Sequence, residues 1–314
     1  MSIENTPVEK EIANSFIRER RLERRWRNIR FFGWVILLLF YAILIFGPSN
    51  SDPSDAVLKN KPYVSLLRLN GVIMPGAAFS AEKVIPQLID AFKDKRALGV
   101  VLLINSPGGS PVQASIIHDK ILQLKKQYNK KVVVVGEDAL ASGSYLVATA
   151  ADKIYVNRDT LTGSIGVIMS GFGFTEAMEK VGVTRRVFTA GENKDRLDPF
   201  EPLKPADVEK VKLVLDDVHN DFIQDVVEGR GTRLKGDPKE LFSGDFWSGS
   251  QAMKLGLVDG TANLWEVLQG EYNAKFYKDY TPEPSLFQKI MTGVESELKL
   301  HLSYNGSPLQ ARAF

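Results

Sequence analysis

Ser142 is the residue of this sequence whose type and position most favour chemistry. It belongs to the small-residue turn Ala-Ser-Gly-Ser at 141–144, which comes after the apolar run KVVVV at 131–135 and before an apolar, helix-like segment at 145–151. A serine between the end of a strand and the start of a helix has free backbone N–H groups beside it. The position therefore suits a nucleophile, and it also suits a serine that only caps the helix.

A nucleophilic serine needs a general base. The chain has no cysteine and only three histidines, of which His118 and His219 fall within predicted helices and are more simply surface or packing residues. Lysine is the remaining partner, provided that burial or nearby positive charge lowers its pKa from about 10.4 to about 7 or 8, a change of about 4 kcal/mol. Lys194 differs from the other lysines because it lies in a predicted loop after a predicted strand at 185–189.

Two further turns could serve the same site. The Pro-Gly-Gly turn at 107–109 follows the apolar run LGVVLLIN at 98–105. Exposed amides at such a turn can form an oxyanion hole, although the tolerance of glycine for positive φ explains the turn without any catalytic role. The turn TGSIG at 162–166 indicates by itself only a bend.

The elements that must position these turns follow an α/β pattern. Continuous Val, Ile and Leu runs alternate with helical segments, which is typical of a parallel sheet covered on both faces. The predicted strands are 63–73, 98–105, 131–135, 153–156 and 185–189, and the predicted helices are 81–92, 112–128, 145–151, 175–181 and 205–229.

The N-terminal region predicts a basic segment followed by a membrane anchor. Residues 1–30 are rich in arginine, and residues 31–46 carry no charge over about 24 Å of helix, which flanking residues can extend to the roughly 30 Å of a bilayer interior. The arginines place the N-terminus in the cytoplasm under the positive-inside rule. We therefore expect an uncleaved signal anchor at 31–47 and a linker at 48–62, with a cleaved signal peptide as the alternative.

In combination, the motifs resemble those of one family, the signal peptide peptidase SppA (protease IV) family of membrane-anchored Ser-Lys peptidases, whose fold is related to ClpP and crotonase. The resemblance covers roughly residues 63–268. It rests on NSPGG at 105–109, ASGSY at 141–145, TGSIGV at 162–167, NKD at 193–195 and GLVD at 256–259.

The resemblance implies a role for each site residue. Ser142 would be the nucleophile and Lys194 the general base. Ser164 would hydrogen-bond the lysine and orient it. The amides of Gly109 and Gly143 would form the oxyanion hole.

One position departs from the family pattern. Ser144 stands where the family usually has a second glycine, and it adds a rival hydroxyl near the nucleophile. The match is nevertheless anchored by Gly143 and Tyr145 at the expected offsets, so Ser142 remains the preferred nucleophile.

The resemblance also implies architecture and partners. The fold would be α/β, with ClpP/crotonase-like repeated ββα units and a parallel sheet, in a peptidase domain at 63–270 followed by a tail at 271–314. A ring of eight copies on the bacterial inner membrane would share active sites between neighbours, with the catalytic domain in the periplasm. Substrates would be remnant signal peptides and other unfolded apolar peptides. We expect no cofactor, no metal and no nucleic acid.

Two other functions stay open at this stage. A crotonase-like acyl-CoA enzyme would use the glycine turns to polarise a thioester, although an extracytoplasmic location would deny it coenzyme A. A non-catalytic membrane scaffold would use Ser142 only as a helix cap.

Overall fold

The structure, a computed structural model, describes residues 26, 28–39, 58 and 61–281. The chain divides into two units, residues 1–59 and 60–314. In the first unit, residues 28–39 form a helix whose side chains are mostly exposed. Within the described ranges, no helix is long and apolar enough to cross a membrane.

Most of the expected N-terminal organisation lies outside the described residues. The helical residues cover only the first part of the expected anchor at 31–47. The expected basic segment at 1–30 and the linker at 48–62 lie almost entirely outside the described ranges. These three expectations therefore stay predictions.

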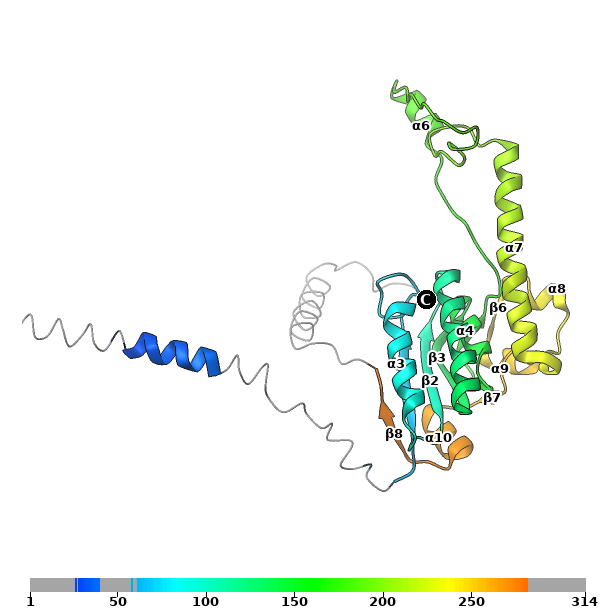
Figure 1. The fold of residues 1–314 in the computed structure, drawn as a ribbon. Coiled ribbons are helices and arrows are strands. Elements are labelled where there is room, and N and C mark those ends of the chain that lie inside the picture. The colour runs from blue at the N-terminus through cyan, green and yellow to red at the C-terminus, as the bar shows by residue number, and fades with distance from the viewer. Residues whose placement is uncertain (1–25, 27, 40–57, 59–60, 282–314) are drawn as a thin grey trace, which may run out of the picture. The chain divides into compact units, whose positions relative to one another are not determined.

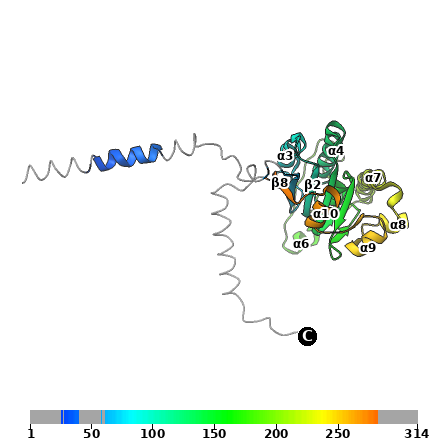
Figure 2. The same cartoon turned by 90° about the horizontal axis from the view of Figure 1, so that it is seen from below.

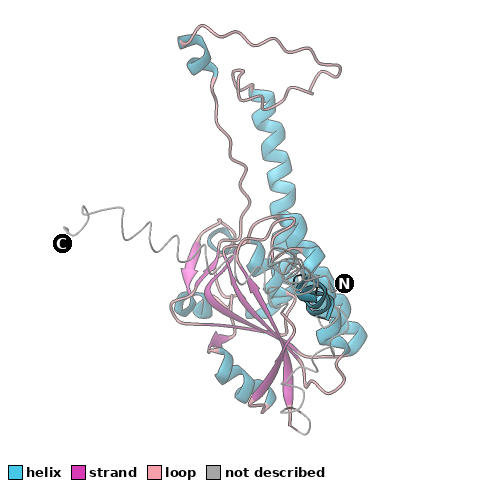
Figure 3. Cartoon of the chain, turned by 90° about the vertical axis from the view of Figure 1, so that its left-hand side faces the viewer, coloured by secondary structure: helices cyan, strands magenta, loops and turns pink. Residues whose placement is uncertain are grey.

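The second unit is built on a sheet of eight strands in the order β6-β5-β3-β2-β1-β8, with β4 beside β3 and β7 beside β4. All neighbours are parallel except β5 and β6. This arrangement confirms the expected α/β fold with a mainly parallel sheet (Figures 1 and 3). The strands are β1 Tyr63–Asn70, β2 Val100–Ser106, β3 Val132–Ala141, β4 Lys153–Val156, β5 Leu161–Gly163, β6 Phe246–Ser248, β7 Gly260–Thr261 and β8 Phe276–Asp279.

The helices follow the strands closely along the chain. In the described part they are α3 Ala81–Lys93, α4 Pro111–Tyr128, α5 Gly143–Thr149, α6 Thr175–Lys180, α7 Pro205–Arg230, α8 Pro238–Leu241, α9 Gly249–Lys254 and α10 Leu264–Tyr272, with a 3-10 turn at Gly231–Arg233. The expected helices from 81 to 229 are therefore present with bounds shifted by a few residues at most.

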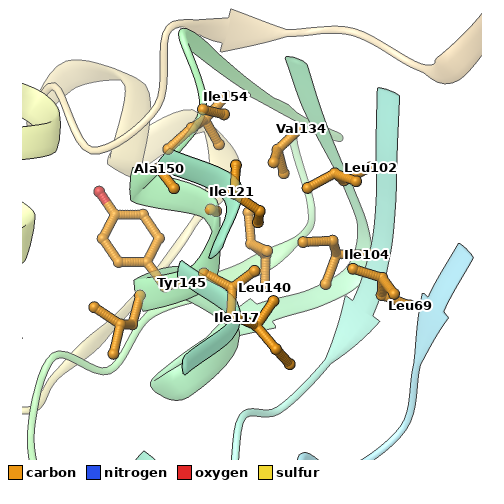
Figure 4. Packing of buried hydrophobic residues seen from close by; sticks show 14 of the residues in the cluster. Leu69, Leu102, Ile104, Ile117, Ile121, Val134, Leu140, Tyr145, Ala150 and Ile154 are labelled. Carbon is orange, nitrogen blue, oxygen red and sulfur yellow. The ribbon is translucent and has the colours of Figure 1, made fainter. Parts of the chain in front are cut away.

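Alternate residues of the central strands point to opposite faces of the sheet. One set, which includes Leu102, Ile104 and Val134, packs against α3, α4 and α5 (Figure 4). The other set, which includes Val101 and Val133, packs against α10. Figure 2 shows α3 and α4 on one side of the sheet and α10 on the other. Because both faces are buried, the strands are continuously apolar in sequence.

Short extended pieces follow the main strands. Ile73, after β1, forms an isolated parallel bridge with Gly109, after β2. Residues 139–141 form the second half of β3 and pair with β5, whereas the first half of β3 pairs with β4. A helix follows each of these pieces, so the expected ββα unit is present in a reduced form. The turns that bear Gly109 and Ser142 come directly after these pieces.

The segment between β5 and α7 leaves the sheet after Val167, and we call residues 168–204 the arm. Figures 1 and 3 show the arm, which contains α6, reaching away from the sheet toward the N-terminal end of α7. The predicted strand at 185–189 is wrong, since these residues form no strand and are all exposed. A strand needs a neighbour for its backbone hydrogen bonds, and the arm offers none at this position.

The domain also extends further than expected. The strand β8 pairs in register with β1, and the Tyr280 hydroxyl donates to Asp94 at 2.6 Å. The expected boundary at 270 is therefore too early, because the end of α10 and the whole of β8 complete the sheet domain. The remainder of the expected tail, residues 282–314, lies outside the described residues.

A buried ion pair fastens the C-terminal end of α7 to the GLVD motif at 256–259. Arg230 is 1% exposed and donates to the Gly256 carbonyl at 3.0 Å and to the Asp259 carboxylate at 2.8 Å. The same carboxylate accepts from the Ile154 amide at 2.7 Å. Burial alone would raise the pKa of Asp259, but these hydrogen bonds hold it below its usual value.

The same motif holds the helix that begins at the predicted nucleophile. The hydroxyl of Tyr145, a buried residue of α5, donates to the Leu257 carbonyl at 2.7 Å. Burial raises the pKa of Tyr145, so the hydroxyl keeps its proton and stays a donor. The GLVD motif therefore supports the start of α5 and, through it, Ser142.

Replacing Asp259 with Asn should lower the free energy of unfolding by about 3 kcal/mol, because Arg230 would remain buried without its counter-charge. The lowered pKa of Asp259 makes this contribution fully present above the unfolded-state pKa of about 4, and it is lost as the pH falls through the folded-state pKa. Urea unfolding at several pH values should therefore show a constant difference between wild type and Asp259→Asn from pH 8 to 5, and a narrowing difference below about pH 4. A difference that widens in acid would contradict this assignment. Asp217→Asn, at an exposed position of α7, is the control.

Candidate active site

Ser142 stands alone between β3, which ends at Ala141, and α5, which begins at Gly143. Its φ is +54°, a left-handed value that a non-glycine residue adopts only when its surroundings hold it there. The Ser142 amide donates to the Gly163 carbonyl at 2.8 Å, and its own carbonyl accepts from the Leu146 amide at 3.0 Å. The side chain makes no capping hydrogen bond. The half-buried hydroxyl is therefore not engaged as a helix cap.

Ser144, the rival hydroxyl, has a different role. It is completely buried, and its hydroxyl lies 2.7 Å from the Ser106 carbonyl and 2.8 Å from the Ala141 carbonyl. A hydroxyl that donates to buried backbone carbonyls satisfies acceptors that would otherwise be left unpaired. Ser144 thus fastens the first turn of α5 to the ends of β2 and β3.

An irregularity in the pairing of β2 with β3 bends the strand that leads to Ser142. The register shifts between Ile104 and Ser106. The Asn105 side chain donates to the Asp138 carboxylate at 2.7 Å and accepts from the Ala139 amide at 3.2 Å. Sequence analysis quoted Asn105 within a motif but gave it no role and missed Asp138, because a bulge of this kind has no sequence pattern of its own.

The amides predicted for the oxyanion hole lie close together. A Cβ atom placed on Gly143 would be 3.5 Å from the Gly109 nitrogen, and one placed on Gly108 would be 2.7 Å from the Gly143 nitrogen. Gly109 has a φ of +147°, and a Cβ there would be 2.1 Å from the Ile73 carbonyl oxygen. Neither the Gly109 nor the Gly143 amide donates to an acceptor among the described residues. Two free donors therefore lie close to the Ser142 side chain.

Ser164 lies beside Ser142 although 22 residues separate them. The pairing of Ala141 with Gly163 brings the ends of β3 and β5 level, and Ser164 is the next residue. Ser164 also has a left-handed φ, +50°, and its amide donates to the Asp245 carbonyl at 2.7 Å. Its hydroxyl makes no hydrogen bond within the described part of the chain. Ser142, Ser164 and the two glycine amides thus form one site.

Lys194 is not part of this cluster in the single chain. It is an exposed residue of the arm, and its amide donates to the Gly191 carbonyl at 3.1 Å. Its neighbour Arg196 is ion-paired at 3.1 Å with Asp207 in the first turn of α7. His219, which contacts the Ile165 carbonyl next to Ser164, lies twelve residues further along α7, or about 18 Å of helix. The arm therefore holds Lys194 well away from Ser142.

Ion pairs fix the loop that carries Lys194. Asp195 pairs with Lys204 at 3.1 Å, and Asp198 pairs with Arg185. Together with the Arg196 pair, these contacts fasten the residues that follow Lys194. Sequence analysis missed them, because the partners are 9 to 13 positions apart in an irregular segment.

The arm carries a large apolar surface. An apolar hollow of about 500 Å³ lies between α6 and the loop after it, lined mainly by Phe174, Met178, Val181, Val183 and Phe200. Other apolar side chains of the arm and of the first half of α7 are exposed, namely Ile168, Met169, Phe172, Val187, Phe188, Leu197, Leu203, Leu213 and Val214. The apolar hollow together with these exposed side chains makes the arm a candidate site of interaction with another molecule.

In the described part of the chain, no group of three or more His, Asp or Glu side chains is arranged to hold a metal ion. The reactive groups of the cluster are a hydroxyl and backbone amides. Such an arrangement can attack a carbonyl carbon and stabilise the oxyanion that forms.

Two family profiles match this chain. The profile of Peptidase family S49 matches residues 124–274, and the profile of Clp protease matches residues 60–179. The "Putative signal peptide peptidase SppA" of Enterococcus faecium is 30% identical over 291 residues, which is 82% of this chain and 83% of the relative. The "Putative protease slr0021" of a Synechocystis species is 31% identical over 242 residues, 75% of this chain and 85% of the relative.

This chain belongs to peptidase family S49. Members of the same group of relatives include proteins named protease 4 from Haemophilus influenzae and Salmonella typhi. Membership in S49 confirms the expected resemblance to the SppA and protease 4 family. The roles of individual residues in the site stay predictions.

A more similar pair of relatives is much longer. The protein named "Na(+)/H(+) antiporter NhaA" of Brucella melitensis is 41% identical over 237 residues, which is 74% of this chain but 32% of the relative. A Brucella abortus protein of the same name matches to the same extent. The chain thus spans about a third of these two relatives.

The two serines can be separated by experiment. Ser142→Ala should abolish labelling by a serine-directed acylating probe, because it removes the hydroxyl beside the free amides. Ser144→Ala should keep the labelling but lower the free energy of unfolding by about 1 to 3 kcal/mol, because the buried carbonyl that accepts from the Ser144 hydroxyl loses its donor. Probe labelling with mass spectrometry, and urea unfolding, measure the two effects. Labelling that survives in Ser142→Ala but is lost in Ser144→Ala would reverse the assignment.

Gly109→Ala should lower kcat by about 100- to 1,000-fold, because the new Cβ displaces the turn and with it one oxyanion donor. Steady-state kinetics on an apolar peptide would measure this loss. Gly270→Ala is the matched control, since a Cβ there meets open space in α10. A wild-type kcat in Gly109→Ala would show that the Gly109 amide does not stabilise the oxyanion.

Proposed function

We propose that this S49 peptidase is a membrane-anchored endopeptidase with a Ser-Lys dyad, in which Ser142 is the nucleophile and Lys194 of a neighbouring copy is the general base. One observation carries the proposal. Ser142, Ser164 and two free amides are gathered at the ends of β2, β3 and β5, whereas Lys194 is held on a separate arm. The site therefore has every part of a serine peptidase except the base, and a second copy can supply it.

The first half of the reaction uses the nucleophile, the base and the two glycine amides. Ser142 Oγ attacks the carbonyl carbon of the scissile peptide bond, and its proton passes to the neutral amine of Lys194. The amides of Gly109 and Gly143 donate to the oxygen that becomes negatively charged. The Lys194 ammonium then protonates the departing amine, the C–N bond breaks, and an acyl ester remains on Ser142.

The second half of the reaction repeats the first with water. Lys194, again neutral, takes a proton from a water molecule that attacks the ester carbon, and the same amides stabilise the second oxyanion. Collapse of this intermediate releases the carboxylic acid product and returns the proton to Ser142. The Ser164 hydroxyl accepts a hydrogen bond from the lysine and keeps its amine directed at Ser142.

A neighbouring copy also explains the chemical environment that a lysine base requires. A neutral lysine near pH 7 needs removal from water or nearby positive charge. In one chain Lys194 is exposed, so docking of the arm against a second copy would bury it. The apolar surface of the arm, residues 168–204, supports such docking, since it would be covered in an assembly. In a closed ring of eight copies, the apolar surface of every arm would be covered by a neighbouring copy.

The substrates we propose are remnant signal peptides and other unfolded apolar peptides. The apolar hollow of the arm and the name of the Enterococcus relative support this class of substrate. The arginine-rich residues 18–30 and the uncharged residues 31–46 support a single-pass anchor in the bacterial inner membrane, with the peptidase domain in the periplasm. An anchored enzyme would meet such peptides where they are released. The unengaged Ser142 side chain speaks against a scaffold in which this serine is only a cap.

Mixing two inactive variants tests the shared site. Ser142→Ala and Lys194→Ala should each lower activity on an apolar peptide by at least about 1,000-fold. A co-assembled equal mixture should regain about a quarter of wild-type activity, because half of the sites have an intact serine and half of those meet an intact neighbouring lysine. Peptide cleavage by the purified mixture measures this recovery.

A matched mixture provides the control. Lys194→Ala combined with the double variant Ser142→Ala/Lys194→Ala contains no intact lysine and should stay inactive. No recovery in the first mixture, despite proven co-assembly, would show that both groups must belong to one chain. Full activity of either single variant would show that the substituted residue is not part of the dyad.

A further inference from the structure

We propose that His219 is a positioning residue that holds the turn at Ser164 in its reactive shape and couples α7 to the nucleophile. The inference rests on the proposed function, in which Ser164 orients the lysine. Its starting point is one contact, since His219 Nε2 lies 3.0 Å from the Ile165 carbonyl oxygen. The sequence by itself favours a surface or packing role for His219.

The turn is held at three consecutive residues, each from a different direction. The Gly163 carbonyl accepts from the Ser142 amide at the end of β3. The Ser164 amide donates to the Asp245 carbonyl, in the loop before β6. The third contact, at the Ile165 carbonyl, comes from α7 and is a side-chain contact. A single substitution can therefore remove it and leave the other two in place.

The backbone at this turn needs such support. Ser164 has a φ of +50°, and a non-glycine residue in this region is strained by about 1 to 2 kcal/mol. A strained residue relaxes toward a negative φ unless its neighbours over-determine its conformation. Rotation at Ser164 would move its hydroxyl and would also pull on the Gly163 carbonyl that holds Ser142. Loss of the third contact should therefore disturb both serines.

The chemistry of the contact fixes the protonation of the imidazole. A carbonyl oxygen only accepts, so Nε2 of His219 must carry a proton. Both the neutral Nε2–H tautomer and the imidazolium satisfy this requirement. The hydrogen bond therefore forms whether the imidazole is neutral, with its proton on Nε2, or positively charged.

His219 lies on α7 between two ion pairs, one near each end of the helix. Toward the N-terminus, Asp207 pairs with Arg196 in the loop that carries Lys194. Toward the C-terminus, Arg230 fastens the helix to the domain. His219 is half-buried between these two ends. A displacement of the arm along α7 would therefore reach the Ser164 turn through this side chain.

Two substitutions separate the hydrogen bond from the bulk of the ring. His219→Leu removes the donor and should lower kcat by about 10- to 100-fold with little change in KM, because the reacting groups are misplaced and the peptide still binds. His219→Gln should recover most of that loss, because its amide nitrogen is as many bonds from Cβ as Nε2 is. Asn220→Leu, at the exposed neighbouring position, is the control for a leucine on this helix. Wild-type kcat in His219→Leu, or an equal loss in His219→Gln, would overturn the inference.

Subunit mixing locates the effect in one chain. His219 and Ser164 belong to the same chain as Ser142, so His219→Leu should reduce the recovered activity when it is placed in the Lys194→Ala chain, which donates the serine. Placed in the Ser142→Ala chain, which donates the lysine, it should have no effect. Equal effects in both placements would assign His219 to folding or to the arm, and would overturn the inference.

A spectroscopic measurement covers the case in which His219→Leu does not fold. In full-length Ser142→Ala protein, 15N NMR of the imidazoles should show His219 with a proton on Nε2. A proton on Nδ1 alone would exclude donation to the Ile165 carbonyl. Failure of the dyad is recognised separately, since it appears as activity in Ser142→Ala or Lys194→Ala. A dyad that behaves as proposed, together with an unaffected His219→Leu, refutes only the positioning role.

Discussion

The hydrogen bond from the Ser142 amide to the Gly163 carbonyl is the contact on which the site depends. It lies at the end of the pairing between β3 and β5, directly after Ala141 pairs with Gly163, and it sets two serines with left-handed φ values side by side. Ser144 and the GLVD motif hold α5, which begins next to Ser142. His219, on α7, contacts the Ile165 carbonyl two residues after Gly163. The sheet and the helices packed on it position the Ser142 amide and the Gly163 carbonyl for this hydrogen bond.

The parts of the fold that sequence predicted well are those governed by burial. The runs at 98–105 and 131–135 are apolar on every residue because both faces of the sheet are covered, and this pattern has few alternatives. Ser142 and the glycine turns were found because small residues after such runs leave exposed amides. Their grouping as one site came from the order of the motifs, and the register of β3 with β5 gives that grouping its physical basis.

The parts that sequence missed depend on contacts between distant residues. The run at 185–189 has strand-like composition, but the arm gives it no partner to pair with, so local preference did not decide its structure. Ser144 looked like a competing nucleophile because sequence does not show which hydroxyls are buried. His219 looked like an ordinary helix residue, since its partner is a backbone carbonyl 54 positions earlier.

The ion pairs around Lys194 order the backbone of its loop within a single chain. Asp195, Arg196 and Asp198 are each fixed by an oppositely charged partner within the same chain, so the backbone beside Lys194 is already ordered before any second copy arrives. Ordering a residue costs about 1 to 2 kcal/mol of conformational entropy. In this chain that cost falls on folding of the protomer, and association in the proposed assembly would then only have to bury surface that is already ordered.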